Sequence, residues 1–264
     1  EALRQAYLHS RGQFITRMDA DDIMAKDKLA LLLSGLISNG RGHIALGQVK
    51  YFSDTAALGS GYKKYEEWLN ALISSGDIWK DIYKECVVPS PCWMALRTDF
   101  DKAGAFDSNH YPEDYDLAFR FYKKGMKVIP CTEVLHYWRD HENRASRNHP
   151  HYQDNTFLPL KCMYFLELDY SPDKQLVLWG AGKKAKTIAS ILIDKEIPFH
   201  WISNNVKKIG HDIFGKNVLD EKSISKWPDV QVIIAVANPD EQTAIKHDVS
   251  RLAQTQQIQT YYFC

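Results

Sequence analysis

One stretch of this sequence decides how its fold is interpreted: Gly12-Gln-Phe-Ile-Thr-Arg-Met-Asp-Ala-Asp-Asp-Ile-Met-Ala-Lys-Asp-Lys-Leu29. The apolar bias of residues 14–18 predicts a strand, which is followed at once by acidic residues. Leucine and isoleucine then recur at helical spacing until Asn39-Gly40, a plausible helix stop. A strand, an acidic turn and a helix in succession are typical of an α/β fold.

The acidic turn has two interpretations. Side chains alternate along an extended segment, so Asp19 and Asp21 are expected to point the same way while Asp22 points elsewhere. Two aligned carboxylates suit Mg²⁺ or Mn²⁺ bridged to a phosphate. Alternatively, the turn only leads into the helix, with Asp22 as a capping residue. The residues alone leave both interpretations open.

These eighteen positions resemble the metal-binding segment of glycosyltransferase family 2, where a strand ends in Asp-x-Asp-Asp and a leucine-rich helix follows. The resemblance implies a GT-A fold with a mixed sheet and a sugar nucleotide bound through a divalent ion. It makes Asp19 and Asp21 the metal-binding pair and Asp22 a diphosphate or donor contact. Only one helix precedes the strand, so the GT-A domain is expected to be incomplete at its N-terminus.

A second acidic group, Glu113, Asp114 and Asp116, follows Pro112. Proline suits the first helical position and acids suit the first turn, so a helix is predicted here, with its dipole keeping a carboxylate ionised. The acids could serve only to stabilise this terminus, which is the preferred interpretation for Asp116. Their pattern also resembles the family's ED motif. That resemblance implies that Asp114 is the general base for the acceptor hydroxyl and that Glu113 orients the acceptor or the loop.

Two further segments resemble the same family. Tyr137-Trp-Arg139-Asp-His141 matches an aromatic-Arg-x-His pattern, which implies that His141 is a metal ligand or diphosphate contact and that Arg139 helps to hold the leaving group. An imidazole ligand favours Mn²⁺ over Mg²⁺. Trp93 lies in a segment similar to the acceptor-side strand and could stack on a sugar, although a core position is preferred.

The sequence predicts two domains, residues 1–170 and 171–264, separated by a polar Ser-Pro segment. In the second, residues 175–189 indicate a strand, a turn containing Gly180 and Gly182, and a helix, an arrangement that can hold a pyrophosphate. Later strands and helices predict a small doubly wound, Rossmann-like domain. A dinucleotide binder usually has an acid after its second strand, where this chain has Ser203-Asn204-Asn205. A structural or docking use is therefore favoured over cofactor binding.

Composition excludes several classes of function. The 264 residues include 33 basic and 33 acidic side chains, so no overall positive field attracts nucleic acid. The five cysteines form no CxxC pair, and His149 and His151 match no metal motif, so neither disulfides nor a zinc site are indicated. No apolar run is long enough to span a bilayer. We expect a cytoplasmic protein that could dock on a membrane surface.

The leading expectation is a metal-dependent enzyme of bacterial polysaccharide or glycan biosynthesis. It would move a sugar from a nucleotide sugar, for example a UDP-sugar, to a glycan or lipid-linked hydroxyl acceptor, with Mn²⁺ or Mg²⁺ as cofactor. The alternatives are a nucleotide-sensing or docking module with a degenerate transferase domain, and an NAD-linked oxidoreductase, which residues 203–205 disfavour. The chain as given is expected to be inactive alone. It is also expected to form a homo-oligomer that covers an exposed sheet edge.

Overall fold

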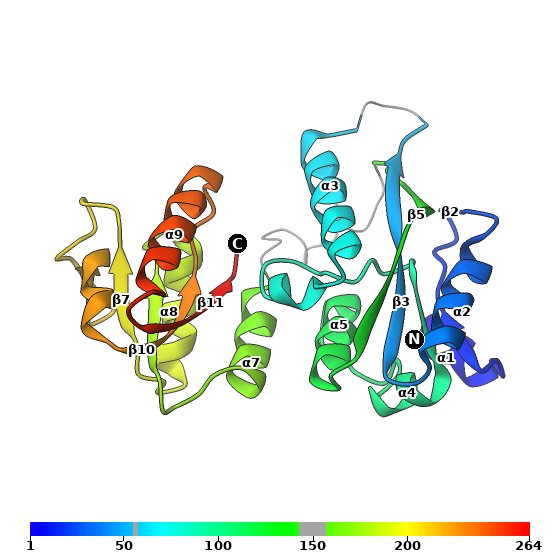
Figure 1. Cartoon of the computed structure of the whole chain (residues 1–264), viewed down its shortest axis with the longest axis horizontal. Coiled ribbons are helices and arrows are strands. Elements are labelled where there is room, and N and C mark those ends of the chain that lie inside the picture. Colours follow the sequence, from blue (N-terminus) through cyan, green and yellow to red (C-terminus); the bar gives the residue numbers. More distant parts are fainter. Residues whose placement is uncertain (55–57, 143–156) are drawn as a thin grey trace. The chain divides into compact units, whose positions relative to one another are not determined.

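A computed structural model describes residues 1–54, 58–142 and 157–264 of the chain (Figure 1). Its contacts divide the chain into two units, Glu1–Ile82 with Cys86–Asn155, and Tyr83–Glu85 with Thr156–Cys264. The contacts group helix α7 (Leu158–Leu168) with the second unit, whereas the sequence interpretation ended the first domain at residue 170. His149 and His151, which match no metal motif in the sequence, lie outside the described ranges.

The first unit is built on a five-stranded sheet in the order β1-β4-β3-β5-β2. Its strands are β1 (Phe14–Thr16), β2 (Ile23–Met24), β3 (His43–Phe52), β4 (Trp93–Leu96) and β5 (Lys127–Arg139). Strands β3 and β5 run parallel, whereas the other three pairings are antiparallel. The predicted α/β class with a mixed sheet is therefore confirmed.

Helices cover both faces of this sheet. They are α1 (Ala2–His9), α2 (Lys28–Asn39), α3 (Ser60–Ser75), α4 (Arg97–Lys102) and α5 (Glu113–Lys123), with a short 3-10 helix η1 (Ile78–Asp81). Figure 1 shows α2 and α3 on opposite sides of β3 and β5, and both helices pack on these strands. Helix α2 buries Leu32 and Leu36, and it stops at Gly40 as predicted.

The pairing of β3 with β5 is irregular at its middle, where the register shifts on either side of Gln48. A Cβ atom built on Gly47 would lie 2.6 Å from Leu135 Cδ1, so a larger residue would displace Leu135. Irregular pairing of this kind bends a strand and re-aims its side chains. Beyond this point β5 pairs with β2, and it carries Arg139 and the following residues to the acidic turn.

The second unit contains a six-stranded sheet in the order β11-β10-β6-β7-β9-β8. Strands β6 (Gln175–Trp179), β7 (His200–Ser203), β9 (Lys216–Asp220), β10 (Asp229–Ile234) and β11 (Gln257–Tyr262) run parallel, and β8 (Asp212–Ile213) is antiparallel to β9. Its other elements are α8 (Lys183–Asp194), η3 (Glu221–Lys226) and α9 (Pro239–Leu252). A parallel sheet with helical crossovers is the predicted Rossmann-like arrangement.

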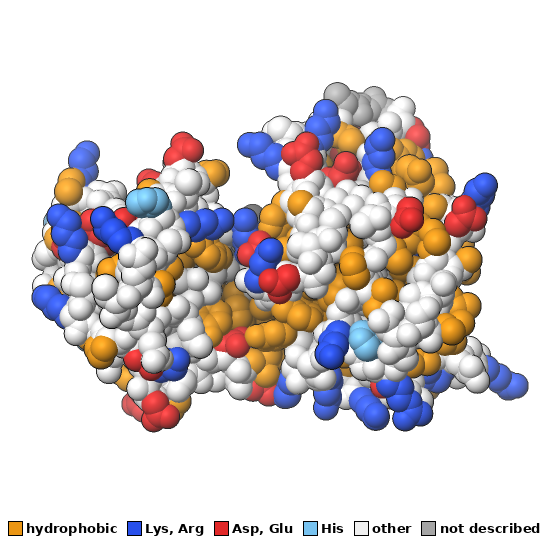
Figure 2. All heavy atoms as spheres, viewed as in Figure 1, with side chains coloured by type: hydrophobic (Ala, Val, Ile, Leu, Met, Phe, Trp, Pro, Cys, Tyr) orange, Lys and Arg blue, Asp and Glu red, His pale blue; other side chains and the backbone are white. Residues whose placement is uncertain are grey.

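The surface carries charges of both signs. Figure 2 shows acidic and basic side chains interspersed over much of the visible face, in line with the equal numbers of each. Exposed apolar side chains recur near the N-terminus, at Leu8, Met18, Ile23, Met24, Leu29 and Ile37. Within the described ranges, no helix is both long and apolar enough to cross a bilayer.

A buried polar chain fixes the acidic turn to β5. Lys28, at the start of α2, is fully buried, and its Nζ lies 3.2 Å from His136 Nδ1 and donates to the Pro91 carbonyl. His136 Nε2 lies 2.8 Å from Asp22 Oδ2, and both side chains are almost completely buried. The other oxygen, Asp22 Oδ1, accepts the Arg139 N–H at 2.8 Å. Both carboxylate oxygens of Asp22 are thus bonded to β5.

Replacing Asp22 with Ala should lower the free energy of unfolding by about 3 kcal/mol, because a buried imidazole and a backbone N–H would lose their acceptor. Chemical denaturation would measure this loss. Asp27→Ala is the matched control, since Asp27 precedes the same helix without a side-chain capping bond, and it should change stability by less than about 0.5 kcal/mol. Equal effects of the two substitutions would contradict the anchoring role of Asp22.

Candidate functional site

The first two acids of the turn between β1 and β2 have different partners. Asp19 Oδ1 lies 2.8 Å from Arg17 Nη2, whereas Asp21 Oδ2 lies 3.1 Å from His141 Nε2. The structure therefore brings together Asp21, which the resemblance made a metal ligand, and His141, which it made a metal ligand or a diphosphate contact. Asp19 faces the guanidinium of Arg17.

The donor set at Asp21 and His141 fits an open site for a divalent ion. Both side chains are accessible, at 52% and 36% exposure, and they offer one carboxylate oxygen and one imidazole nitrogen. Among the residues that the structure describes, no three His, Cys, Asp or Glu side chains form a group able to hold a metal. An ion here would need further ligands from phosphate oxygens and water, as is common for Mg²⁺ and Mn²⁺ in nucleotide sites.

Arg139 borders this pair. Its Nε donates to the Asp21 carbonyl at 2.6 Å, and its guanidinium forms an ion pair with Asp54 and lies over the Phe52 ring. The side chain is 29% exposed. A cation in this position adds positive charge beside the carboxylates of the turn.

Two predicted contact residues lie in the interior. The Asp22 carboxylate is 3% exposed and bonded to His136 and Arg139, so its contacts are those of an anchor and not of a donor-binding group. Trp93 is 1% exposed and packs on the rings of Phe100 and Phe121. This is the core position preferred from sequence, and it leaves no face of Trp93 for a sugar.

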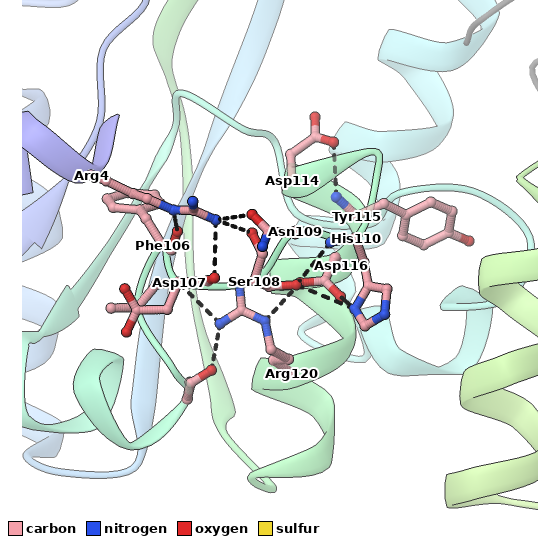
Figure 3. Close-up of polar contacts among 12 residues, drawn as sticks. Arg4, Phe106, Asp107, Ser108, Asn109, His110, Asp114, Tyr115, Asp116 and Arg120 are labelled. Atoms are coloured by element: carbon pink, nitrogen blue, oxygen red, sulfur yellow. Dashed lines mark hydrogen bonds and ion pairs between the residues drawn. The ribbon is translucent and has the colours of Figure 1, made fainter. Parts of the chain in front are cut away.

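Asp114 and Asp116 leave α5 on different sides (Figure 3). Asp116 is fully buried, with Oδ2 2.8 Å from Arg120 Nε and Oδ1 3.4 Å from His110 Nδ1. Asp114 is half-buried and accepts the Tyr115 N–H at 2.8 Å. Asp116 is therefore enclosed by structural partners, whereas the Asp114 side chain is only partly buried.

Burial, followed by the charge of Glu113, raises the pKa of Asp114 to about 6, although Arg17 opposes this shift. The dipole of α5 favours the ionised form, as the sequence predicts, but removal from water outweighs the dipole, so the net shift of the Asp114 pKa is upward. A carboxylate with a pKa near 6 is ionised at neutral pH and also accepts a proton readily, as a general base must.

Two arginines hold the loop that leads into α5, as Figure 3 shows. Arg120 Nη1 donates to the carbonyls of Ala103 and Ala105. Arg4 donates to the three carbonyls and one side-chain oxygen of the next segment, Phe106, Asp107, Ser108 and Asn109. The loop that precedes Glu113 and Asp114 in the chain is therefore held in place by hydrogen bonds from Arg4 and from Arg120.

Sequence analysis missed three residues that organise this region: Arg17, Lys28 and His136. The sequence contains a pattern that could have indicated Arg17 and another that could have indicated Lys28. Arg17 is two positions before Asp19 in an extended segment, which places both side chains on one face. Lys28 falls at helical spacing with Leu32 and Leu36, so it had to lie on the buried stripe of α2. No comparable pattern pointed to His136.

In the second unit, the turn after β6 has the backbone of a glycine-rich loop. Gly180 has φ +121°, and a Cβ atom there would lie 3.0 Å from the Ala235 carbonyl oxygen, while Gly182 precedes α8 as its N-cap. Trp201 Nε1 donates to the Gly180 carbonyl at 2.6 Å. Asn204, at the end of β7, accepts from Trp179 Nε1, so its amide oxygen is already engaged.

Comparison with known proteins finds similarity to part of the first unit. Residues 1–104 match the family described as Glycosyl transferase family 2. A curated relative, "Probable glycosyltransferase YdaM" of Bacillus subtilis (strain 168), is 24% identical over 127 residues, which cover 48% of this chain. The match spans only 30% of that relative's length.

Solved structures resemble smaller parts of the chain. A UDP-D-quinovosamine 4-dehydrogenase from Vibrio fischeri has 18% identity and a TM-score of 0.28, covering 33% of this chain and 76% of its own. RSP, a Rex-family repressor, has 15% identity and a TM-score of 0.27, covering 39% and 60%. Likenesses this weak assign no function. The sequence matches are stronger evidence: residues 1–104, within the first unit, are similar to glycosyl transferase family 2.

Proposed function

We propose that this chain takes part in metal-dependent transfer of a sugar from a nucleoside-diphosphate sugar to a hydroxyl acceptor. The observation that carries the proposal is the convergence of the two acidic motifs on Arg17. Its guanidinium lies 2.8 Å from Asp19 and 3.8 Å from Glu113. Donor-side and acceptor-side groups that are distant in sequence therefore adjoin in space. The family match ends at residue 104, so the role of Asp114 rests on its own environment.

In the proposed reaction, the acceptor oxygen attacks the anomeric carbon of the donor sugar while the bond from that carbon to the diphosphate oxygen breaks. Asp114 takes the acceptor proton, and the nucleoside diphosphate leaves with the bonding electrons. Attack opposite to the leaving group inverts the configuration. Asp21 and His141 would hold a divalent ion, which neutralises charge on the leaving diphosphate. Arg139 adds a fixed positive charge beside them.

Bacterial polysaccharide or glycan synthesis is the proposed setting, and the cytoplasm the proposed location. A nucleotide-sensing or docking module remains the alternative. Binding of a nucleoside diphosphate without transfer would favour that alternative, so donor binding and turnover have to be measured on the same preparation.

In the full-length gene product, Asp114→Asn should lower kcat by about 10² to 10⁴, the usual scale for a lost general base, while donor binding survives. An ionised Asp114 is unfavourable in the folded protein above pH 6, so the variant should unfold at an equal or higher temperature than the wild type. A loss of activity with a lower melting temperature, or a loss smaller than about tenfold, would count against this role.

The pH dependence provides a separate prediction. With the pKa of Asp114 near 6, kcat/KM should be constant above about pH 7 and fall about tenfold per pH unit well below pH 6. Glu113→Gln removes a charge that raises this pKa, so the acid limb should move to lower pH. A pH–rate profile of both proteins would measure the shift. An acid limb that stays in place would show that another group titrates.

Asp21→Ala should abolish Mn²⁺-dependent binding of a nucleoside diphosphate, because it removes the carboxylate that adjoins His141. Calorimetry with Mn²⁺ and UDP or GDP would measure the binding. Asp27→Ala, at an exposed position, is the control and should bind as the wild type does. Unchanged Mn²⁺ dependence in Asp21→Ala would exclude the site.

For the second unit we propose a structural or docking use. No acid follows β7, and the Asn204 amide oxygen is engaged by Trp179. The chain should therefore bind NAD⁺ and NADH weakly. A dissociation constant below about 10 µM by calorimetry, worth roughly 7 kcal/mol, would overturn this prediction.

A further inference from the structure

Arg17 occupies an unusual position between the two acidic motifs. It follows β1 directly, and its side chain is only 13% exposed. One terminal nitrogen, Nη2, lies 2.8 Å from Asp19 Oδ1, and the other, Nη1, lies 3.8 Å from Glu113 Oε1. The Nε atom is buried without a hydrogen-bond partner in the described structure. The guanidinium is thus held by carboxylates on two segments of chain.

The charges around Arg17 explain why a cation is retained there. Burial opposes its charge, but the carboxylates of Asp19, Asp114 and Glu113 together raise the pKa of Arg17. Three negative groups would repel one another without it. A guanidinium presents its nitrogens in a planar fork and can meet two carboxylates at once, whereas a lysine ammonium is a single point charge.

We propose that Arg17 is a positioning residue that fixes the donor-side turn relative to the acceptor-side helix through Asp19 and Glu113. The inference rests on the proposed function. Arg17 contacts Asp19 and Glu113, so it would act by placing these two carboxylates and, through helix α5, the neighbouring Asp114. Transfer requires the acceptor oxygen and the anomeric carbon to approach in line, and small errors of placement lower the rate steeply.

The kinetic test uses Arg17→Met and Arg17→Lys in the full-length gene product. Arg17→Met should lower kcat by about 10²-fold while the donor KM changes less than about threefold. Arg17→Lys restores the charge without the fork, so its kcat should fall between those of the wild type and Arg17→Met. Arg41→Met, at an exposed position in the turn before β3, is the control and should leave both constants unchanged.

A second test needs no turnover and compares melting temperatures. In the wild type, Asp19→Asn or Glu113→Gln removes a partner of Arg17 and should lower the melting temperature by about 1 to 3 °C. The same two substitutions are then made in Arg17→Met and in Arg17→Lys, where they measure the interaction of the carboxylates with one another without the guanidinium. In the Arg17→Met background, Asp19→Asn or Glu113→Gln should raise the melting temperature, because only repulsion between the carboxylates is left to relieve. In the Arg17→Lys background the same substitutions should have intermediate effects. The Arg17→Lys background replaces Arg17→Met if the latter does not fold.

The outcomes are distinguishable. The proposal is supported if Asp19→Asn and Glu113→Gln lower the melting temperature of the wild type but raise that of Arg17→Met, and if Arg17→Met loses kcat at constant donor KM. Effects of the same sign in the wild-type and Arg17→Met backgrounds would show that Arg17 merely fills space, and an unchanged kcat would show that the link does not serve transfer. If the wild type transfers no sugar, the proposed function fails, and the melting temperatures alone decide whether Arg17 links the two motifs.

Discussion

The attachment of one carboxylate, Asp22, to strand β5 is the constraint on which the candidate site depends. Asp22 receives His136 Nε2 through one oxygen and the Arg139 N–H through the other. The other attachments of the acidic turn to β5 and the residues after it are the two-residue strand β2 and the more exposed contacts of Asp21 with Arg139 and His141. Because Asp22 is fixed, its neighbour Asp21 faces solvent beside His141. A buried polar group that is fully bonded can specify a single arrangement in this way.

Much of the fold could be predicted from local patterns. Helix α2, the strand β6 and the glycine turn after it follow from apolar spacing and from Gly40 and Gly180. Strand β5 was not predicted from the sequence. It contains Pro130 and Glu133, and its burial does not alternate, because its pairing with β3 is interrupted by an irregularity. Such a strand forms because it pairs with other strands, and local sequence patterns do not show which strands will pair.

The candidate site was predictable where a motif resembled a known family, and less so elsewhere. Asp21 and His141 were assigned to one site by resemblance, and they lie 3.1 Å apart. The burial of Asp22 could not be foreseen, since it depends on a histidine 114 residues away. The raised pKa of Asp114 was missed for a related reason: helix position can be read from sequence, but loss of water around a side chain depends on tertiary packing.

The order of these segments along the chain also determines when the candidate site can form during synthesis of the protein. Asp21 and Asp22 meet their partners on and just after β5 across 114 to 120 residues. A growing polypeptide emerges from the ribosome N-terminus first, so the acidic turn is made long before β5. Until then His136, Arg139 and His141 do not exist as partners, and strand β2 has no neighbour. The acidic turn of an incomplete nascent chain therefore lacks these partners, and the contacts that hold Asp21 and Asp22 can form only after residue 141 has been made.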